Sequence, residues 1–257
     1  MIKSEKPRVA PLERVVLASM LCGLIAFPLT AHFFAVALIF AALTFFALVS
    51  RFRFAFELGL FFTVGVAALH LGVGYSQLWI GASFLGYGLI ASMTRGGVAD
   101  FAWLRRGKVD RTTVVLAATF TLGAAIALIL WQQMTKPDLH DLFTTFVPHW
   151  PLHWLLLGAL GFSMFNAAAE EIAYRGLVLA AIESGFGAVP ALLGQAIAFG
   201  TLHINGFPRG AIGVALASIY GVMMGFLRLR SRGLLVPWAA HVITDFVIAM
   251  ILLLLAR

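Results

Sequence analysis

Long apolar runs, separated by short polar connections, make up most of the chain. A hydrocarbon layer about 30 Å thick takes about 20 apolar residues per helix, which is close to the length of many of these runs. The runs are continuous and do not alternate apolar with polar residues, so they predict helices and not the strands of a membrane barrel. We therefore expect an all-α, polytopic bundle of eight or nine transmembrane helices, over residues 15–29, 33–49, 58–73, 78–93, 114–131, 155–184, 188–203, 211–227 and 234–255.

The first two runs are short and are separated only by residues 28–32. They predict either two spans or one bent re-entrant pair, and this choice decides the number of helices. The first run also follows several basic residues, as the apolar part of a signal peptide does. Because many more apolar runs follow it, we interpret it as a retained first helix.

The composition indicates a lipid environment. The 257 residues are 61% hydrophobic and 11% charged, and the mean hydropathy is +0.98, a balance that no soluble domain needs to fill one core. The formal net charge is +7, but the basic residues are dispersed among the apolar runs, so we expect no nucleic-acid partner. The only cysteine, Cys22, lies in an apolar run, which excludes an internal disulfide and a CxxC motif.

The basic residues predict the orientation of the helices. They gather at the N-terminus and over residues 51–53, 95–111 and 228–232, which places these connections in the cytoplasm by the positive-inside rule. The intervening connections, 74–77 and 132–153, are poor in basic residues, and tryptophans typical of an aromatic belt lie in or beside the second of them. We expect an integral, multi-pass protein of a prokaryotic plasma membrane, with the lipid bilayer around it and its N-terminus in the cytoplasm.

Ionisable residues inside the apolar runs are concentrated toward the C-terminus. Each such residue costs about 2.5–3.5 kcal/mol on insertion scales, so a cluster of them indicates a function. The cluster consists of Glu170, Glu171, Arg175, His203, His241 and Asp245. We therefore divide the chain into about five N-terminal transmembrane helices at residues 1–151 and a catalytic core at residues 152–257.

Helical spacing sorts these residues, because residues four apart share a face. Glu171 and Arg175 are four apart and can neutralise each other as a structural pair. This pairing leaves Glu170, about 100° around the helix, as the carboxylate that is free for chemistry. His241 and Asp245 are likewise four apart and form one polar face.

Glu170 and His203 are expected at the same depth in the membrane. Glu170 lies about 15 residues before the turn signal at residues 184–190 and His203 about 16 residues after it, so each stands roughly 23 Å from the hairpin. Asn166, one turn before Glu170, either orients that carboxylate or bonds to a neighbouring helix. Convergence of the ionisable residues on one polar pocket is therefore feasible.

Three motifs occur in order along this part of the chain: EExxxR at residues 170–175, FxxxH at residues 199–203 and HxxxD at residues 241–245. As a set within apolar helices, they resemble the EExxxR, FxxxH and HxxxN/D motifs of the CPBP family. This Abi-like family contains type II CAAX prenyl endopeptidases and bacteriocin-processing enzymes. The resemblance covers about residues 152–255.

The resemblance implies a glutamate-dependent intramembrane endopeptidase that cleaves a membrane-associated protein or peptide. Glu170 and His203 would activate water, and His241 and Asp245 would stabilise the oxyanion. Donors aimed at a developing oxyanion contribute several kcal/mol, and a carboxylate in a low-dielectric pocket is a stronger base for a water shared with an imidazole. No residue selects among a prenylated CAAX tail, a bacteriocin or pheromone leader, and a C-terminal sorting tail.

Asp245 is an aspartate where an oxyanion donor would most naturally be an asparagine. An ionised aspartate cannot donate a hydrogen bond, so Asp245 is protonated, orients His241, or binds a metal ion. In the last case Glu170, His203, His241 and Asp245 form a zinc site of two histidines and two carboxylates, although an HExxH motif is absent. A non-catalytic membrane module, such as an immunity factor or a proton-coupled transporter, is a further alternative.

Overall fold

The computed structural model describes residues 9–70, 88, 104–138 and 150–255. Within these residues every regular element is a helix, which confirms the predicted all-α class. The predicted run at residues 78–93 lies outside the described part of the chain, except for residue 88. Five described helices are long and apolar enough to cross a membrane: Pro11–Leu29, Arg111–Thr135, Leu152–Phe186, Gly210–Ser231 and Leu235–Leu255. Phe34–Val49 and Ala188–Ile204 are shorter apolar helices.

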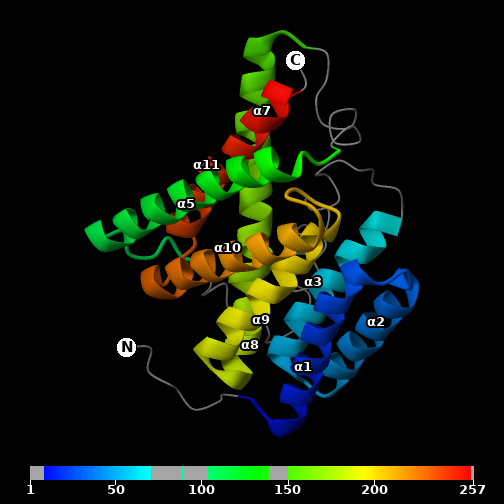
Figure 1. Cartoon of the computed structure of the whole chain (residues 1–257). Helices are drawn as coiled ribbons and strands as arrows, with labels where there is room; N and C mark the ends of the chain where they lie inside the picture. The colour runs from blue at the N-terminus through cyan, green and yellow to red at the C-terminus, as the bar shows by residue number, and fades with distance from the viewer. Residues whose placement is uncertain (1–8, 71–87, 89–103, 139–149, 256–257) are drawn as a thin grey trace.

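The first three helices form one group on one side of the molecule (Figure 1). They are α1 (Pro11–Ala26), which ends in a 3-10 turn (Phe27–Leu29), α2 (Phe33–Val49) and α3 (Arg53–His70). The buried carboxylate of Glu13 on α1 accepts hydrogen bonds from the backbone N–H groups of Phe54 (3.0 Å) and Ala55 (3.4 Å). These bonds satisfy the first turn of α3, so that helix begins before its predicted start at residue 58.

The next described helix is α5 (Arg111–Thr135), which extends beyond the predicted run 114–131 at both ends. Asp110 caps its N-terminus, because its carboxylate accepts a hydrogen bond from the Thr113 N–H (2.8 Å). This bond favours the ionised form and lowers the pKa of Asp110. The polar cap lengthens the helix beyond its apolar part, which is why apolar runs alone underestimate it.

The C-terminal helices form the centre of the structure. α7 (Leu152–Glu170), a π-helical segment (Glu171–Val178) and α8 (Leu179–Phe186) run on as one continuous helix, which corresponds to the predicted run 155–184. The remaining elements are α9 (Ala188–Thr201), a 3-10 turn (Leu202–Ile204), α10 (Gly210–Ser231) and α11 (Leu235–Leu255).

The connection that precedes α5 is fixed to the connection between α10 and α11. The Lys108 N–H donates to the Ser231 carbonyl (2.7 Å), and the Leu234 N–H donates to the Arg105 carbonyl (2.8 Å). Both connections are basic and were assigned to one side of the membrane from the sequence. Their contact agrees with that assignment, because connections on opposite sides could not touch.

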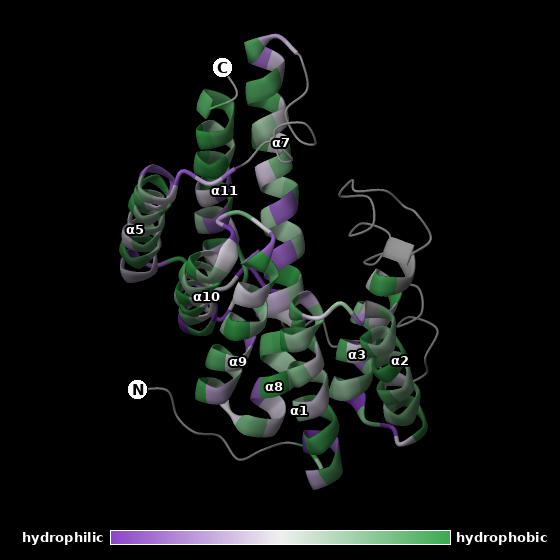
Figure 2. Cartoon of the chain, turned by 45° about the vertical axis from the view of Figure 1, so that its right-hand side comes forward, coloured by the Kyte–Doolittle hydropathy of each residue, from purple (hydrophilic) through white to green (hydrophobic). Residues whose placement is uncertain are grey.

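Helix packing joins the N-terminal group to the rest of the bundle. α1 contacts α8 and α9, while α11 packs against α5, α7 and α10. Apolar residues cover most of the helix surfaces (Figure 2), and large side chains such as Phe45, Leu122 and Leu157 are exposed. Arg175 and Gln195 are instead fully buried. Apolar surfaces with polar groups inside are what a lipid environment requires.

Candidate active site

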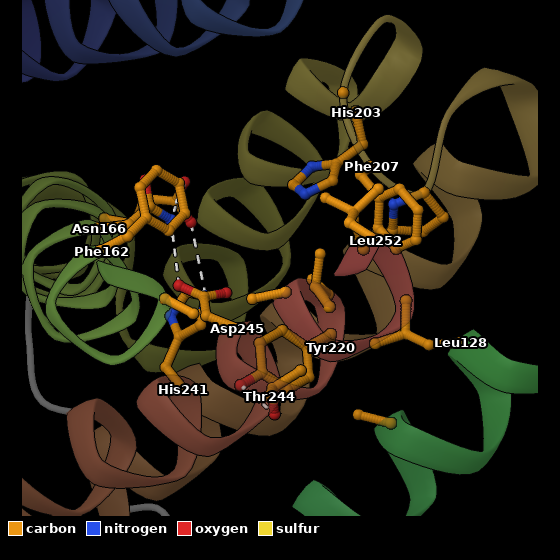
Figure 3. A pocket seen from close by; sticks show the side chains of 18 of the residues that line it. Leu128, Phe162, Asn166, His203, Phe207, Tyr220, His241, Thr244, Asp245 and Leu252 are labelled. Atoms are coloured by element: carbon orange, nitrogen blue, oxygen red, sulfur yellow. Dashed lines mark hydrogen bonds and ion pairs between the residues drawn. The ribbon is translucent and has the colours of Figure 1, made fainter. Parts of the chain in front are cut away.

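A cavity of about 640 Å³ lies between α5, α7, α9, α10 and α11. The four side chains predicted to carry the chemistry all line it: Glu170, His203, His241 and Asp245. Glu170 ends α7, His203 lies in the turn after α9, and the other two lie on α11. Figure 3 shows His203, His241 and Asp245 around this space. The structure therefore brings together residues from three separate segments.

The two glutamates lie on either side of the His241 ring. His241 Nδ1–H donates to Glu171 Oε1 (2.8 Å), and His241 Nε2 lies 3.5 Å from Glu170 Oε2. The helix changes from α to π between Glu170 and Glu171. A π turn is wider than an α turn and often occurs at functional sites. Here it falls where two adjacent carboxylates both approach one imidazole.

Glu171 and Arg175 form the ion pair that their spacing predicts. Arg175 Nη1 lies 3.0 Å from Glu171 Oε1, and the two side chains are 0% and 1% exposed. The Arg175 guanidinium also lies over the ring of Phe199, 4.4 Å from its centroid. The Phe199 ring in turn contacts the rings of His203 (5.0 Å between centroids) and His241 (6.1 Å). The phenylalanine of the second motif thus connects the buried cation to both histidines.

Asn166 contacts both cavity carboxylates. Its Nδ2 donates to Glu170 Oε1 (3.2 Å) and to Asp245 Oδ2 (3.1 Å), and the other oxygen of Asp245 lies 3.4 Å from His241 Nε2. The sequence left open whether Asn166 orients Glu170 or bonds to a neighbouring helix. In the structure it does both.

His203 has one ring nitrogen occupied by its own helix. Its Nδ1–H donates to the Phe199 carbonyl (3.2 Å), because a carbonyl oxygen can only accept. In a neutral imidazole this bond leaves Nε2 with a lone pair, and the ring lines the cavity. The described residues show no direct hydrogen bond between His203 and Glu170, although both side chains line the same cavity.

Tyr220 and Thr244 are polar cavity residues that the sequence reasoning missed. The Tyr220 hydroxyl donates to Thr244 Oγ1 (3.2 Å), and the Tyr220 ring lies 5.3 Å from the His241 ring, centroid to centroid. Tyr220 stands in the apolar sequence of α10 with no charged neighbour or motif. The one feature of the sequence that could have identified Tyr220 as a cavity residue is its hydroxyl group within a membrane span.

The rest of the cavity wall is apolar. It includes Phe162 of α7, which lies beside Asn166 in Figure 3, and Leu128 of α5 and Leu252 of α11, which lie across the space from Asn166. Trp150 and Trp154 also contribute to this wall. A polar end joined to an apolar space suits a ligand that has both a polar and an apolar portion. Because α5 supplies part of the wall, the cavity is not formed by the C-terminal helices alone.

The described residues contain no group of three or more His, Cys, Asp or Glu side chains arranged to hold a metal ion. His241 Nδ1 is already bonded to Glu171, and His203 Nδ1 to the Phe199 carbonyl. The predicted zinc set of Glu170, His203, His241 and Asp245 therefore lines one cavity without forming a recognisable ligand cluster.

Comparison with known proteins agrees with this class of site. Residues 151–247 match the family described as type II CAAX prenyl endopeptidase Rce1-like. The matched range contains all three motifs, and it supports the assignment of the chain to the CPBP family of CAAX-type proteases. No curated protein and no solved structure matches the chain significantly. The family match over these residues supports an intramembrane endopeptidase of the CAAX type.

Proposed function

We propose that this protein hydrolyses a peptide bond of a membrane-associated protein or peptide with a water molecule activated by Glu170 and His203. The observation that carries the proposal is the convergence of Glu170, His203 and His241 on one cavity that is otherwise mainly apolar. Direct attack by water is proposed over a covalent intermediate, because the described residues that line the cavity include no serine or cysteine.

In this mechanism Glu170 removes a proton from the water, while His203 Nε2 accepts the second hydrogen bond and orients it. The hydroxide adds to the carbonyl carbon of the substrate. Glu170 then returns the proton to the leaving nitrogen as the C–N bond breaks, so protons balance over the cycle. Both carboxylate and imidazole are in place before the substrate binds, which lowers the entropic part of the barrier.

His241 is the proposed donor to the oxyanion. Glu171 accepts from its Nδ1–H, so Nε2 is the nitrogen toward the cavity, and it donates to the oxyanion only when the ring is protonated at both nitrogens. The carboxylates of Glu170, Glu171 and Asp245 around the ring favour this charged form. The Asp245 carboxylate lies 3.4 Å from the same Nε2 and carries no donor when it is ionised. Of the roles open to Asp245, orientation of His241 is the one that this geometry supports.

The proposal is tested in cells that contain the wild type, Glu170→Gln or Asp138→Asn. The last variant is the matched control, because Asp138 is an exposed carboxylate outside the cavity. Mass spectrometry of protein termini in the membrane fraction should find one or more uncleaved proteins that accumulate only with Glu170→Gln. Identical sets of termini in all three strains would refute the assignment of Glu170 as the base.

A further inference from the structure

We infer that Asn166 is a positioning residue that holds the carboxylates of Glu170 and Asp245 in their working orientation. This inference rests on the proposed function and adds a residue outside the three motifs to the catalytic machinery. It follows from a closed circuit of polar contacts at the cavity wall.

The circuit passes through four side chains from two helices. Asn166 Nδ2 contacts Glu170 Oε1 (3.2 Å) and Asp245 Oδ2 (3.1 Å). The remaining oxygens, Glu170 Oε2 and Asp245 Oδ1, lie 3.5 Å and 3.4 Å from His241 Nε2. Each carboxylate therefore has one oxygen on the amide and the other toward the imidazole. Figure 3 shows the Asn166 contact to Asp245 between α7 and α11.

An amide is well suited to this place. It carries two N–H groups on one nitrogen, so each carboxylate can receive its own donor. Donors to ionised oxygens form the stronger, charge-assisted kind of hydrogen bond. Two carboxylates that approach the same imidazole also repel each other, and a neutral double donor between them offsets that repulsion without adding charge.

The position of the amide explains how the third motif can end in Asp245. The last position of the HxxxN/D motif is asparagine or aspartate. Because it is Asp245 in this chain, α11 has no side-chain amide at that position. In this chain α7 supplies an amide to the same carboxylate, one turn before Glu170. The site keeps one amide next to its carboxylates, but the amide comes from the opposite helix.

Steady-state kinetics of three single variants test the positioning role. The probe is an internally quenched peptide that ends in a farnesylated CAAX sequence, and the full-length protein is held in detergent micelles. Asn166→Leu removes both donors at similar size, and Asn166→Asp also adds a third carboxylate. We expect kcat to fall about 10- to 100-fold with KM changed less than about threefold, because misorientation of a reacting group affects the chemical step.

Ser163→Ala is the matched control for these variants. Ser163 is a buried polar residue one turn before Asn166 on the same helix, and its hydroxyl donates to the Ala159 carbonyl of its own helix. Its removal should leave kcat unchanged. Wild-type kcat in Asn166→Leu, or an equal loss in Ser163→Ala, would overturn the positioning role.

An exchange of the Asn166 amide with the Asp245 carboxylate gives the sharpest kinetic test. The double variant Asn166→Asp with Asp245→Asn restores one amide between the two helices. We expect it to recover kcat at least about tenfold over Asn166→Asp alone, since an amide again separates the carboxylates. If the loss in Asn166→Asp came from an unrelated structural defect, the second change would not restore kcat. A double variant with the kcat of Asn166→Asp alone would therefore contradict the inference.

A stability measurement distinguishes failure of this inference from failure of the proposed function. Melting temperatures of Asn166→Leu, Asp245→Ala and their combination should show coupling, so that the double variant loses less than the sum of the two singles. Coupling together with identical sets of protein termini in wild-type and Glu170→Gln cells would refute the proposed function and leave the contact intact. Additive losses would refute the Asn166 contact whether or not the protein cleaves.

Discussion

Arg175 is a fully buried cation, and its neighbours show how the bundle tolerates it. Glu171 provides an ion pair at 3.0 Å, and Phe199 places its ring face 4.4 Å from the guanidinium carbon. A cation is attracted to the negative face of an aromatic ring, most strongly where water is excluded. Loss of either neighbour leaves a charge without sufficient compensation, which costs more than the pair contributes when it is intact.

We expect Glu171→Ala to lower the free energy of unfolding by about 3–5 kcal/mol, because Arg175 loses its ion-pair partner in a buried position. His241 loses its Nδ1 acceptor in the same variant, so cleavage should also disappear. Glu170→Gln should abolish cleavage with little change in stability, since its side chain is 26% exposed and the glutamine oxygen can still accept from Asn166. Denaturant unfolding of both purified variants measures their free energies of unfolding. Equal free energies would contradict the distinction between the two glutamates.

The role of Asp245 separates a metal-free mechanism from a zinc mechanism. In the metal-free case Asp245→Asn should preserve or raise activity at neutral pH, because the introduced amide keeps an acceptor for Asn166 and adds a donor near the substrate. In a zinc mechanism the same change removes an anionic ligand and weakens metal retention and activity together. Activity of both forms is compared before and after exhaustive chelation, with bound metal quantified. Recovery of the wild type only on addition of zinc, with an inactive variant, would exclude the metal-free mechanism.

At the residue scale, spacing within one helix could be predicted and contacts between helices could not. The Glu171–Arg175 and His241–Asp245 pairs follow from residues four apart, and both are close in the structure. The contact of His241 with Glu171 joins residues 70 positions apart, and that of Asn166 with Asp245 joins residues 79 positions apart. Such contacts depend on how α7 and α11 are packed, which no local pattern specifies.

At the scale of elements, the close approach of α9 and α10 positions His203. Gly200 lies three residues before this histidine and faces α10. A Cβ at Gly200 would lie 2.8 Å from the Val214 carbonyl oxygen and would overlap Ser218 Oγ. The absence of a side chain therefore allows the two backbones to approach closely, as small residues do in membrane helix pairs.

Gly200→Ala should force α9 and α10 apart and displace His203 from the cavity. We expect a loss of stability of about 1–3 kcal/mol, as for other overpacked positions, and a marked loss of cleavage. Gly161→Ala on α7 is the control, because a Cβ there meets nothing within 4 Å. An alanine at this second position should leave cleavage unchanged and favour the helix slightly. If both variants cleave like the wild type, the α9–α10 contact does not position His203.

Element positions could largely be predicted from apolar runs, because a lipid environment imposes a strong and simple pattern. The predicted run 33–49 coincides with α2, whereas α5 and α10 extend beyond their apolar parts into polar caps and basic turns. The π-helical segment Glu171–Val178 could not be predicted. A π turn has no composition of its own, and its sequence fits an α-helix equally well.

At the scale of the whole molecule, charged residues follow two patterns: they are buried inside the bundle, and they gather in the connections at one end of the helices. Across the bundle, large apolar side chains are exposed, whereas ionisable residues within the spans, such as Arg175 and His241, are buried. Along the bundle, the basic connections around Lys108 and Ser231 are joined by backbone hydrogen bonds. Both connections must therefore reach the same aqueous compartment, which makes the predicted orientation testable with a small number of labelled positions.

Single cysteines introduced at Arg106, Arg230 and Lys136 test this orientation in intact cells, and all three positions are exposed. Cys22 is exposed and is first replaced by alanine, so that it does not contribute background labelling. We expect a membrane-impermeant thiol reagent to label Lys136→Cys and to leave Arg106→Cys and Arg230→Cys unlabelled until the cells are lysed, because basic connections remain in the cytoplasm.

Ser231 is unsuitable for this test because it is fully buried, and a cysteine there would be protected in either orientation. Labelling of the two arginine positions with protection of Lys136→Cys would invert the topology, and opposite results at Arg106 and Arg230 would contradict the contact between the two basic connections.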